Sequence, residues 1–210
     1  MSAAPVIAVD FDNTIVSYDS LIHGLALKGN LIEATVSKNK TAVRDRVRTL
    51  PDGERRWQEI QAAAYGKEMD QAQPAEGVQD FFSTCAKRNC RVYIVSHKTE
   101  YAAQDDGGTN LHSAAMDWMA NHGFFNENGL GLSQDQVFFE DTRRAKLDRV
   151  NSLGCSHFID DLEETFLEGS VSLAMEKILY APHGAQRDLP GVKRAANWRE
   201  VTGYVFNDVD

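Results

Sequence analysis

Acidic and hydroxyl side chains follow short apolar runs in this 210-residue chain, and the first such place is the most informative. The run Val6–Val9 is followed by Asp10, Asp12 and Thr14. Carboxylates placed this closely can hold a divalent cation, and a carboxylate beside such a cation can act as a nucleophile. The start of the chain therefore predicts a site that attacks an electrophilic centre.

Two later apolar runs end in the same way. Ser96, His97 and Lys98 follow one of them, and the acidic pair Asp160 and Asp161 follows another. In an open parallel sheet, ligands bind beyond the carboxyl ends of the strands. We therefore expect these side chains to converge on one site, although they lie far apart in the sequence.

The combination of charges at these strand ends favours phosphoryl transfer. Asp10 and Asp160 can supply the oxygen ligands that Mg²⁺ prefers, and Asp10 can also serve as the nucleophile. A second acid, Asp12, can protonate the leaving oxygen and later activate water. The hydroxyl of Ser96 and the ammonium of Lys146 can bind the phosphoryl oxygens as charge develops on them.

Several of these residues also fit an ordinary structural role. Lys146 has Arg143 and Arg144 as close neighbours, so any of the three can be the cation of the site, and a solvated helix lysine is the alternative. His97 and Lys98 fit either substrate contacts or plain loop residues. We carry Lys146, His97 and Lys98 forward as predicted substrate contacts, together with Thr14 and Ser96.

The elements that must position these residues alternate along the chain. Five continuous apolar runs are typical of strands buried on both faces. They are Val6–Val9, Arg91–Val95, Val137–Phe139, His157–Ile159 and Lys177–Tyr180. Helix-like stretches separate them, which predicts an α/β fold: a Rossmann-like parallel sheet with helices on both faces.

The stretch between the first two strands is different. Residues 17–75 are too long for an ordinary crossover and contain no convincing strand. Apolar residues recur there at helical spacing, which predicts a small α-helical cap; the expected buried positions are Leu21, Leu25, Val43, Val47, Trp57, Ile60 and Ala64. The predicted domains are therefore an α/β core, residues 1–16 and 76–210, and a helical cap, residues 17–75.

Taken in order, the strand-end motifs resemble those of the haloacid dehalogenase-like (HAD) hydrolase superfamily. Its first motif, DxDx[TV], is matched by residues 10–14, and its second, a Ser or Thr that ends the next strand, by Ser96. The Lys of its third motif is matched by Lys146, and its final acidic pair by Asp160 and Asp161. The resemblance covers about residues 5–16 and 74–182.

The resemblance implies a role for each acid. Asp10 is then the nucleophile, and Asp12 is the general acid and base, with its backbone carbonyl touching the metal. Asp160 completes the Mg²⁺ site, and Asp161 or Glu164 supports it, although both also fit a helix-start capping arrangement. Dehalogenases of this family lack the second Asp of the first motif, so the presence of Asp12 favours phosphate chemistry.

Composition limits the partners. The formal net charge is −9, whereas nucleic acids and anionic membranes require a basic face, so we expect neither as a partner. Three cysteines without CxxC spacing, and the lack of a signal-like N-terminus or an apolar run of membrane-spanning length, predict a soluble cytoplasmic protein. Nothing in the sequence sets the oligomeric state.

The sequence thus predicts a Mg²⁺-dependent phosphomonoesterase that acts on a small phosphorylated metabolite through an aspartyl-phosphate. The alternative is a catalytically silent module of the same fold that binds a phosphorylated ligand. A third hypothesis, an enzyme for phosphorylated macromolecules, ranks lower because a cap of this size obstructs bulky substrates.

Overall fold

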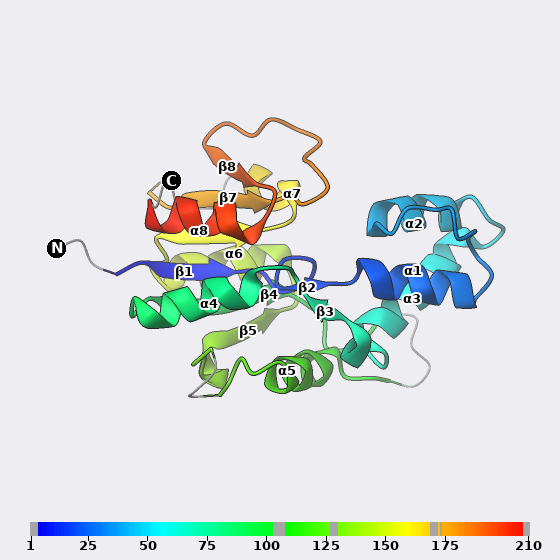
Figure 1. The fold of residues 1–210 in the computed structure, drawn as a ribbon, viewed down its shortest axis with the longest axis horizontal. Helices are drawn as coiled ribbons and strands as arrows, with labels where there is room; N and C mark the ends of the chain where they lie inside the picture. The colour runs from blue at the N-terminus through cyan, green and yellow to red at the C-terminus, as the bar shows by residue number, and fades with distance from the viewer. Residues whose placement is uncertain (1–3, 103–107, 127–129, 169–171, 173, 208–210) are drawn as a thin grey trace. The chain divides into compact units, whose positions relative to one another are not determined.

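The computed structural model describes residues 4–102, 108–126, 130–168, 172 and 174–207. They divide into two compact units. The core unit comprises residues 1–15, 74–98 and 122–210, and the helical unit comprises residues 16–73 and 99–121. Figure 1 shows the ribbon of both units.

The core unit contains a six-stranded sheet in which every neighbouring pair is parallel, with the order β5-β4-β1-β6-β7-β8. The strands are β1 (Val6–Val9), β4 (Arg91–His97), β5 (Val137–Glu140), β6 (His157–Asp160), β7 (Glu176–Tyr180) and β8 (Val192–Ala195). The five strands expected from apolar runs are all present, and the predicted Rossmann-like α/β class is confirmed. The sixth, β8, was not predicted.

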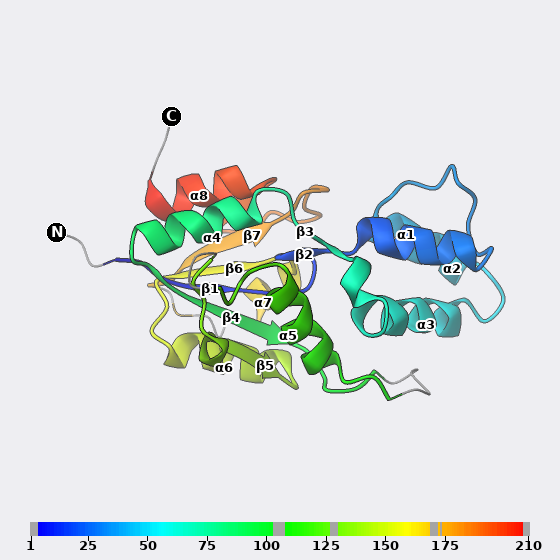
Figure 2. The ribbon, with the colours of Figure 1, turned by 60° about the horizontal axis from the view of Figure 1, so that its bottom comes forward.

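Helices cover both faces of this sheet. On one face lie α4 (Val78–Lys87) and α8 (Trp198–Phe206), and on the other lies α6 (Arg143–Ser152), as Figure 2 shows. The α6 face buries Leu147 and Val150 against Phe158 and neighbouring apolar residues of the sheet. Burial of apolar surface on both faces explains why the strands read as continuous apolar runs.

An aromatic cluster fills the opposite face. The Trp198 ring of α8 lies 4.9 Å from Phe81 of α4 and 5.4 Å from Tyr180 of β7, measured between ring centroids. Phe82 contacts Phe124 at 5.2 Å. Such contacts, at 4.5–7 Å, stabilise beyond the area that they bury. Short elements complete this unit: η2 (Gln134–Gln136) and α7 (Glu163–Leu167).

The helical unit is built from α1 (Asp19–Lys28), α2 (Lys40–Arg48), α3 (Gly53–Tyr65), η1 (Met69–Gln71) and α5 (Leu111–Asn121). The predicted positions on α1, α2 and α3 are buried, except for Leu25, which is half-buried. Helix α5 joins this unit because Trp118 is buried in it and donates from Nε1 to the carbonyl of Ala72 at 2.9 Å.

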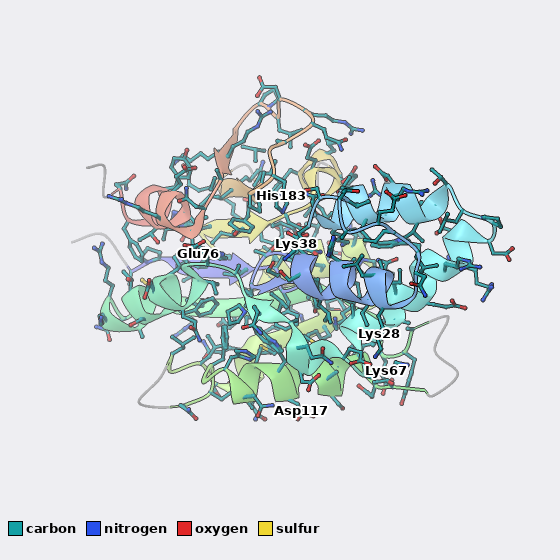
Figure 3. The ribbon with its side chains drawn as sticks, turned by 45° about the vertical axis from the view of Figure 1, so that its right-hand side comes forward. Lys28, Lys38, Lys67, Glu76, Asp117 and His183 are labelled. Carbon is teal, nitrogen blue, oxygen red and sulfur yellow. The ribbon has the colours of Figure 1, made fainter. Side chains whose placement is uncertain are left out.

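The basic side chains of the helical unit are mostly solvated. Arg48 pairs with Glu54, and Arg55 pairs with Glu59, both between exposed side chains. The lysines of this unit that are labelled in Figure 3 are exposed as well: Lys28, Lys38 and Lys67.

Two short strands, β2 (Val16–Ser17) and β3 (Gln73–Pro74), pair where the chain leaves residue 15 and returns at residue 74. The sequence-based division assigned residues 17–75 to a cap and the segment 99–121 to the core; this division stays a prediction, whereas by contacts the segment 99–121 groups with the helical unit. Among the described residues, no helix combines the length and apolarity that a membrane crossing requires.

Candidate active site

Three neighbouring strands deliver the predicted acids and hydroxyl to one end of the sheet. Asp10 follows β1, Ser96 lies near the end of β4, and Asp160 ends β6; the sheet order places β1 between the other two. The amide of Asp10 donates to the carbonyl of Ile159 at 2.9 Å, which extends the β1–β6 pairing by one residue. All three side chains are buried.

Lys146 is the cation at the centre of the group. Its Nζ lies 2.5 Å from Oδ1 of Asp10 and 2.6 Å from Oδ2 of Asp160. The lysine comes from the first turn of α6, which begins after Thr142, whose hydroxyl accepts from the amide of Ala145. A side-chain cap of this kind satisfies a backbone donor that the helix leaves unpaired.

The neighbouring arginines do not take this place. Arg143 pairs with Glu168 at 2.6 Å, and Arg144 pairs with Asp148 at 3.0 Å on the solvated side of α6. Of the three candidate cations in this turn, the structure thus brings Lys146 to Asp10.

Hydroxyl groups contact both oxygens of Asp10. Ser96 donates from Oγ to Oδ1 at 3.2 Å, and Thr14 donates from Oγ1 to Oδ2 at 3.3 Å. Thr14 is itself buried. The carboxylate of Asp10 is therefore held in one orientation by three side chains that the sequence analysis named.

The electrostatics of this group follow from burial. Desolvation raises the pKa of Asp10 to about 6; Lys146 opposes the shift, and the nearby charge of Asp160 adds to it. Burial by itself would lower the pKa of Lys146, but the carboxylates of Asp10 and Asp160 outweigh it and raise that pKa above its ordinary value. The Lys146 side chain is therefore an ammonium at neutral pH.

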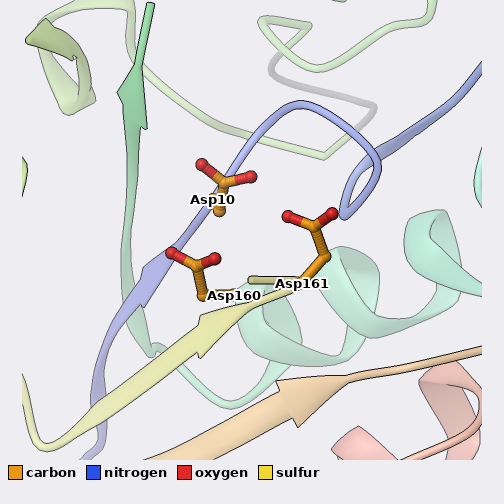
Figure 4. A group of neighbouring side chains, drawn as sticks. All are labelled: Asp10, Asp160 and Asp161. Atoms are coloured by element: carbon orange, nitrogen blue, oxygen red, sulfur yellow. The ribbon is translucent and has the colours of Figure 1, made fainter. Parts of the chain in front are cut away.

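Asp10, Asp160 and Asp161 form a possible metal site. Each offers one carboxylate oxygen, and the three oxygens lie within 4.8 Å of one another. Figure 4 shows the three carboxylates gathered where β1 and β6 end. A set of hard oxygen donors with at least one partly solvated member fits Mg²⁺, which keeps several waters. Glu164, the predicted alternative to Asp161, is exposed on α7 and is not one of the three.

Asp12 has a lysine of its own. Nζ of Lys98 lies 3.0 Å from Oδ1 and 2.9 Å from Oδ2 of Asp12. The Lys98 side chain is only 2% exposed and that of Asp12 is 17% exposed. His97 points elsewhere: it is exposed, and its Nε2 lies 3.2 Å from the carbonyl of Asp141. Of the two neighbours, Lys98 is the one brought to the predicted acids.

The sequence indicates Lys98 as a candidate contact, but it does not indicate that Asp12 is its partner. A signal was present, because side chains alternate along a strand. Ser96 faces inward, so the residue two positions later faces inward as well, and the residue between them faces outward. The identity of the partner, 86 positions away, could not be read from this pattern.

Comparisons with solved structures identify the fold. A HAD-like family hydrolase from Streptococcus pneumoniae aligns with a TM-score of 0.57 at 16% identity, covering 97% of this chain and 99% of that one. A phosphoserine phosphohydrolase-like protein from Francisella tularensis aligns with a TM-score of 0.54 at 13% identity, covering 96% and 100%. A magnesium-bound putative HAD hydrolase from Bacillus subtilis aligns with a TM-score of 0.53 at 12% identity, covering 98% and 100%.

The chain therefore has the fold of the haloacid dehalogenase-like hydrolases, as the four motifs led us to expect. No protein-family model and no curated protein sequence matches it. At identities of 10–16% the likeness establishes the fold, so the roles of the individual residues rest on their geometry.

Proposed function

We propose that the chain is a Mg²⁺-dependent phosphomonoesterase that acts on a small phosphorylated metabolite through an aspartyl-phosphate on Asp10. The observation that carries the proposal is the arrangement around Asp10. Lys146, Ser96 and Thr14 hold its carboxylate, and Asp160 and Asp161 lie beside it. We keep the assignment of a helical cap, residues 17–75, as part of this proposal, together with a cytoplasmic location and the absence of nucleic-acid or membrane partners.

In the first step a carboxylate oxygen of Asp10 attacks phosphorus, and the bond from phosphorus to the ester oxygen breaks. Asp12 donates a proton to the departing oxygen, so the alcohol leaves neutral. In the second step a water molecule attacks the phosphorus of the aspartyl-phosphate while Asp12 takes its proton, and the bond from phosphorus to the carboxylate oxygen of Asp10 breaks. Inorganic phosphate leaves, and both aspartates return to their starting state.

The other residues supply charge and position. Ser96 and Lys146 bind the oxygens of the phosphoryl group, whose charge is redistributed in the transition state. Mg²⁺, held by Asp10, Asp160 and Asp161 and by the backbone carbonyl of Asp12, would offset the repulsion between the attacking carboxylate and the phosphate. A carboxylate with a raised pKa and a buried ammonium beside it is typical of a site tuned for chemistry.

The presence of Asp12 favours hydrolysis over silent binding, because a module that only binds phosphate needs no acid. It also favours phosphate esters over carbon–halogen bonds, since dehalogenases of this fold lack this residue. Asp12 accordingly separates the proposed function from both rivals.

The test is turnover of p-nitrophenyl phosphate with and without Mg²⁺, followed by a panel of phosphorylated metabolites and 2-haloacids. We expect Mg²⁺-dependent release of phosphate, and a loss of at least about 10³-fold in kcat in Asp10→Asn, which removes the nucleophile. Beryllium fluoride with Mg²⁺ mimics a carboxyl-bound phosphoryl group and should raise the melting temperature of the wild type but not of Asp10→Asn.

Activity that persists undiminished in Asp10→Asn would refute the assignment of the nucleophile. Melting shifts with phosphorylated ligands but no hydrolysis would support the binding module instead. Release of halide would support a dehalogenase.

A further inference from the structure

A second buried lysine, Lys98, lies beside the site and has no role in the two steps of the proposed reaction. Lys98 contacts both carboxylate oxygens of Asp12, at 3.0 and 2.9 Å, and its side chain is 2% exposed. Lys146 contacts both Asp10 and Asp160. The two buried ammonium groups thus contact different acids of the site: Lys146 contacts Asp10 and Asp160, and Lys98 contacts Asp12.

Lys98 is firmly anchored. Its backbone amide donates to the carbonyl of Glu140 at 3.0 Å, which continues the β4–β5 pairing by one residue beyond His97. Its Nζ lies 5.7 Å from the centre of the ring of Phe11, the residue that precedes Asp12. Strand pairing and the aromatic neighbour hold the Lys98 ammonium in place, and the ammonium in turn holds the Asp12 carboxylate that it contacts.

The backbone of Asp12 forms a single β-bridge. It lies beyond the end of β1, and Asn13, which follows it, has a φ of 61°, in the left-handed region. A turn therefore begins directly after Asp12. Contact of one ammonium with both oxygens restricts rotation of the carboxylate about its χ angles, which backbone pairing alone does not do.

We propose that Lys98 is a positioning residue that orients the carboxylate of Asp12 for proton transfer to the leaving group. The inference rests on the proposed function and deepens it. Proton transfer requires the acid within about 2.6–3.2 Å of the oxygen that receives the proton. A misplacement of about 1 Å can lower the rate by about 10²-fold.

This role differs from the substrate contact first assigned to Lys98. The ammonium contacts both oxygens of the Asp12 carboxylate, so a phosphate ligand would have to compete with that carboxylate. If the lysine acts through Asp12, its removal lowers the rate of hydrolysis most for substrates whose leaving group needs a proton. A lysine that binds the phosphoryl group affects all phosphate esters alike.

The experiment compares two esters that differ in this need. The leaving group of p-nitrophenyl phosphate departs readily without a proton, whereas that of an alkyl phosphate does not. We measure kcat/KM for both esters, because it reports the step in which the leaving group departs, and the inhibition constant of inorganic phosphate. The variants are Lys98→Met and Lys98→Arg, and Lys87→Met is the control because Lys87 is exposed on α4.

In Lys98→Met we expect kcat/KM for the alkyl ester to fall about 30–100-fold. For p-nitrophenyl phosphate we expect a fall below about 3-fold, and the inhibition constant of phosphate should stay within about 2-fold of the wild type. Lys98→Arg keeps a cation with several donors, so it should stay within about 5-fold of the wild type on both esters. Lys87→Met should match the wild type throughout.

A double variant shows whether Lys98 affects the rate through Asp12 or independently of it. If Lys98 acts through Asp12, Asp12→Asn combined with Lys98→Met should be no slower on the alkyl ester than Asp12→Asn alone, within about 2-fold. The double variant also removes both charges together, so it guards against a Lys98→Met protein that fails to fold.

Three results would overturn the inference alone: an equal loss on both esters together with weaker phosphate inhibition, an unchanged rate on the alkyl ester in Lys98→Met, or a further loss in the double variant. In each of these, Asp10→Asn still abolishes turnover in an otherwise active protein. A wild-type protein without activity on any phosphate ester would overturn the proposed function, and this inference with it.

Discussion

Replacement of Lys146 by Met tests the buried charge cluster without any assumption about substrate. The ammonium is 2.5 Å from Asp10 and 2.6 Å from Asp160, and the three side chains are 3%, 6% and 0% exposed. Breaking a buried ion pair by removing one partner costs about 3–5 kcal/mol, because the other partner keeps its desolvation penalty. At this degree of burial, solvent screening gives no discount, so we expect a loss in that range.

The assay is thermal unfolding of the metal-free protein, with EDTA present, at pH 7.5. For a chain of this size about 1 kcal/mol corresponds to about 2–4 °C, so the expected fall in melting temperature is about 6–20 °C. Lys87→Met removes an exposed lysine and serves as the control. Adding Asp160→Asn to Lys146→Met should restore part of the loss, because it removes one of the two uncompensated charges.

The pH dependence of this loss has a definite sign. Lys146 lowers the pKa of Asp10, so without it the pKa in the folded state lies even further above the value of 3.8 in the unfolded chain. The folded variant then holds a proton that the unfolded chain releases, and its stability falls as pH rises through the folded pKa. The deficit should therefore be largest at pH 7.5 and smaller at pH 5.

Mg²⁺ should reverse much of the loss, because a divalent cation held by the same carboxylates replaces the missing ammonium. Stabilisation by a ligand reaches about 2.7 kcal/mol at one hundred times its dissociation constant. If Lys146→Met melts within about 1 °C of the wild type in EDTA, the reasoning from burial is wrong. If it melts at the same temperature with and without Mg²⁺, the predicted metal site is wrong.

Two further predictions concern stability. Gly24→Ala should raise the free energy of unfolding by about 0.5–1 kcal/mol, since a Cβ at this exposed position inside α1 meets nothing within 4 Å. Gly53→Ala should lower the free energy of unfolding by about 1–3 kcal/mol, because its Cβ would lie 2.5 Å from the carbonyl oxygen of Val47. Urea unfolding of the two variants measures both effects, and equal effects would contradict the steric argument. Burial lowers the pKa of His157, with Glu176 opposing and Lys193 adding to the shift, so the unfolded chain takes up a proton before the folded one and stability falls as pH drops below about 6.5. Urea midpoints at pH 7.5 and 5.5 should therefore differ less in His157→Gln than in the wild type, and an unchanged difference would refute this assignment.

The strands of the core could be predicted because they are buried on both faces. The run Val6–Val9 has the same bounds in the structure, and the run that begins at Arg91 extends to His97 because the pairing with β5 continues to that residue. Strand β8 (Val192–Ala195) was missed because Lys193 and Arg194 occupy its centre, and this strand lies at the edge of the sheet. Charged residues are tolerated at an edge, which hides the apolar pattern.

The grouping of Asp10, Ser96, Lys146 and Asp160 could be predicted because each lies at or near the end of a strand or the start of a helix. Parallel strands gather such positions whatever their distance in sequence. The contact of Lys98 with Asp12 could not be foreseen, because the partner of an inward-facing side chain depends on the turn after β1. Similarly, the pattern of α5 indicates that one face is buried but not against which neighbours.

The contact of Trp118 with Ala72 bears on how this protein can be dissected. The helical unit is discontinuous in sequence: one excursion of the chain contributes residues 16–73 and a second contributes residues 99–121. Excising residues 17–73 alone would strip α5 of Ala72 and leave the Trp118 indole without the acceptor that it has in the intact chain. A minimal version of the core must therefore give up both excursions together, and any recombination with a relative must exchange them as a matched pair.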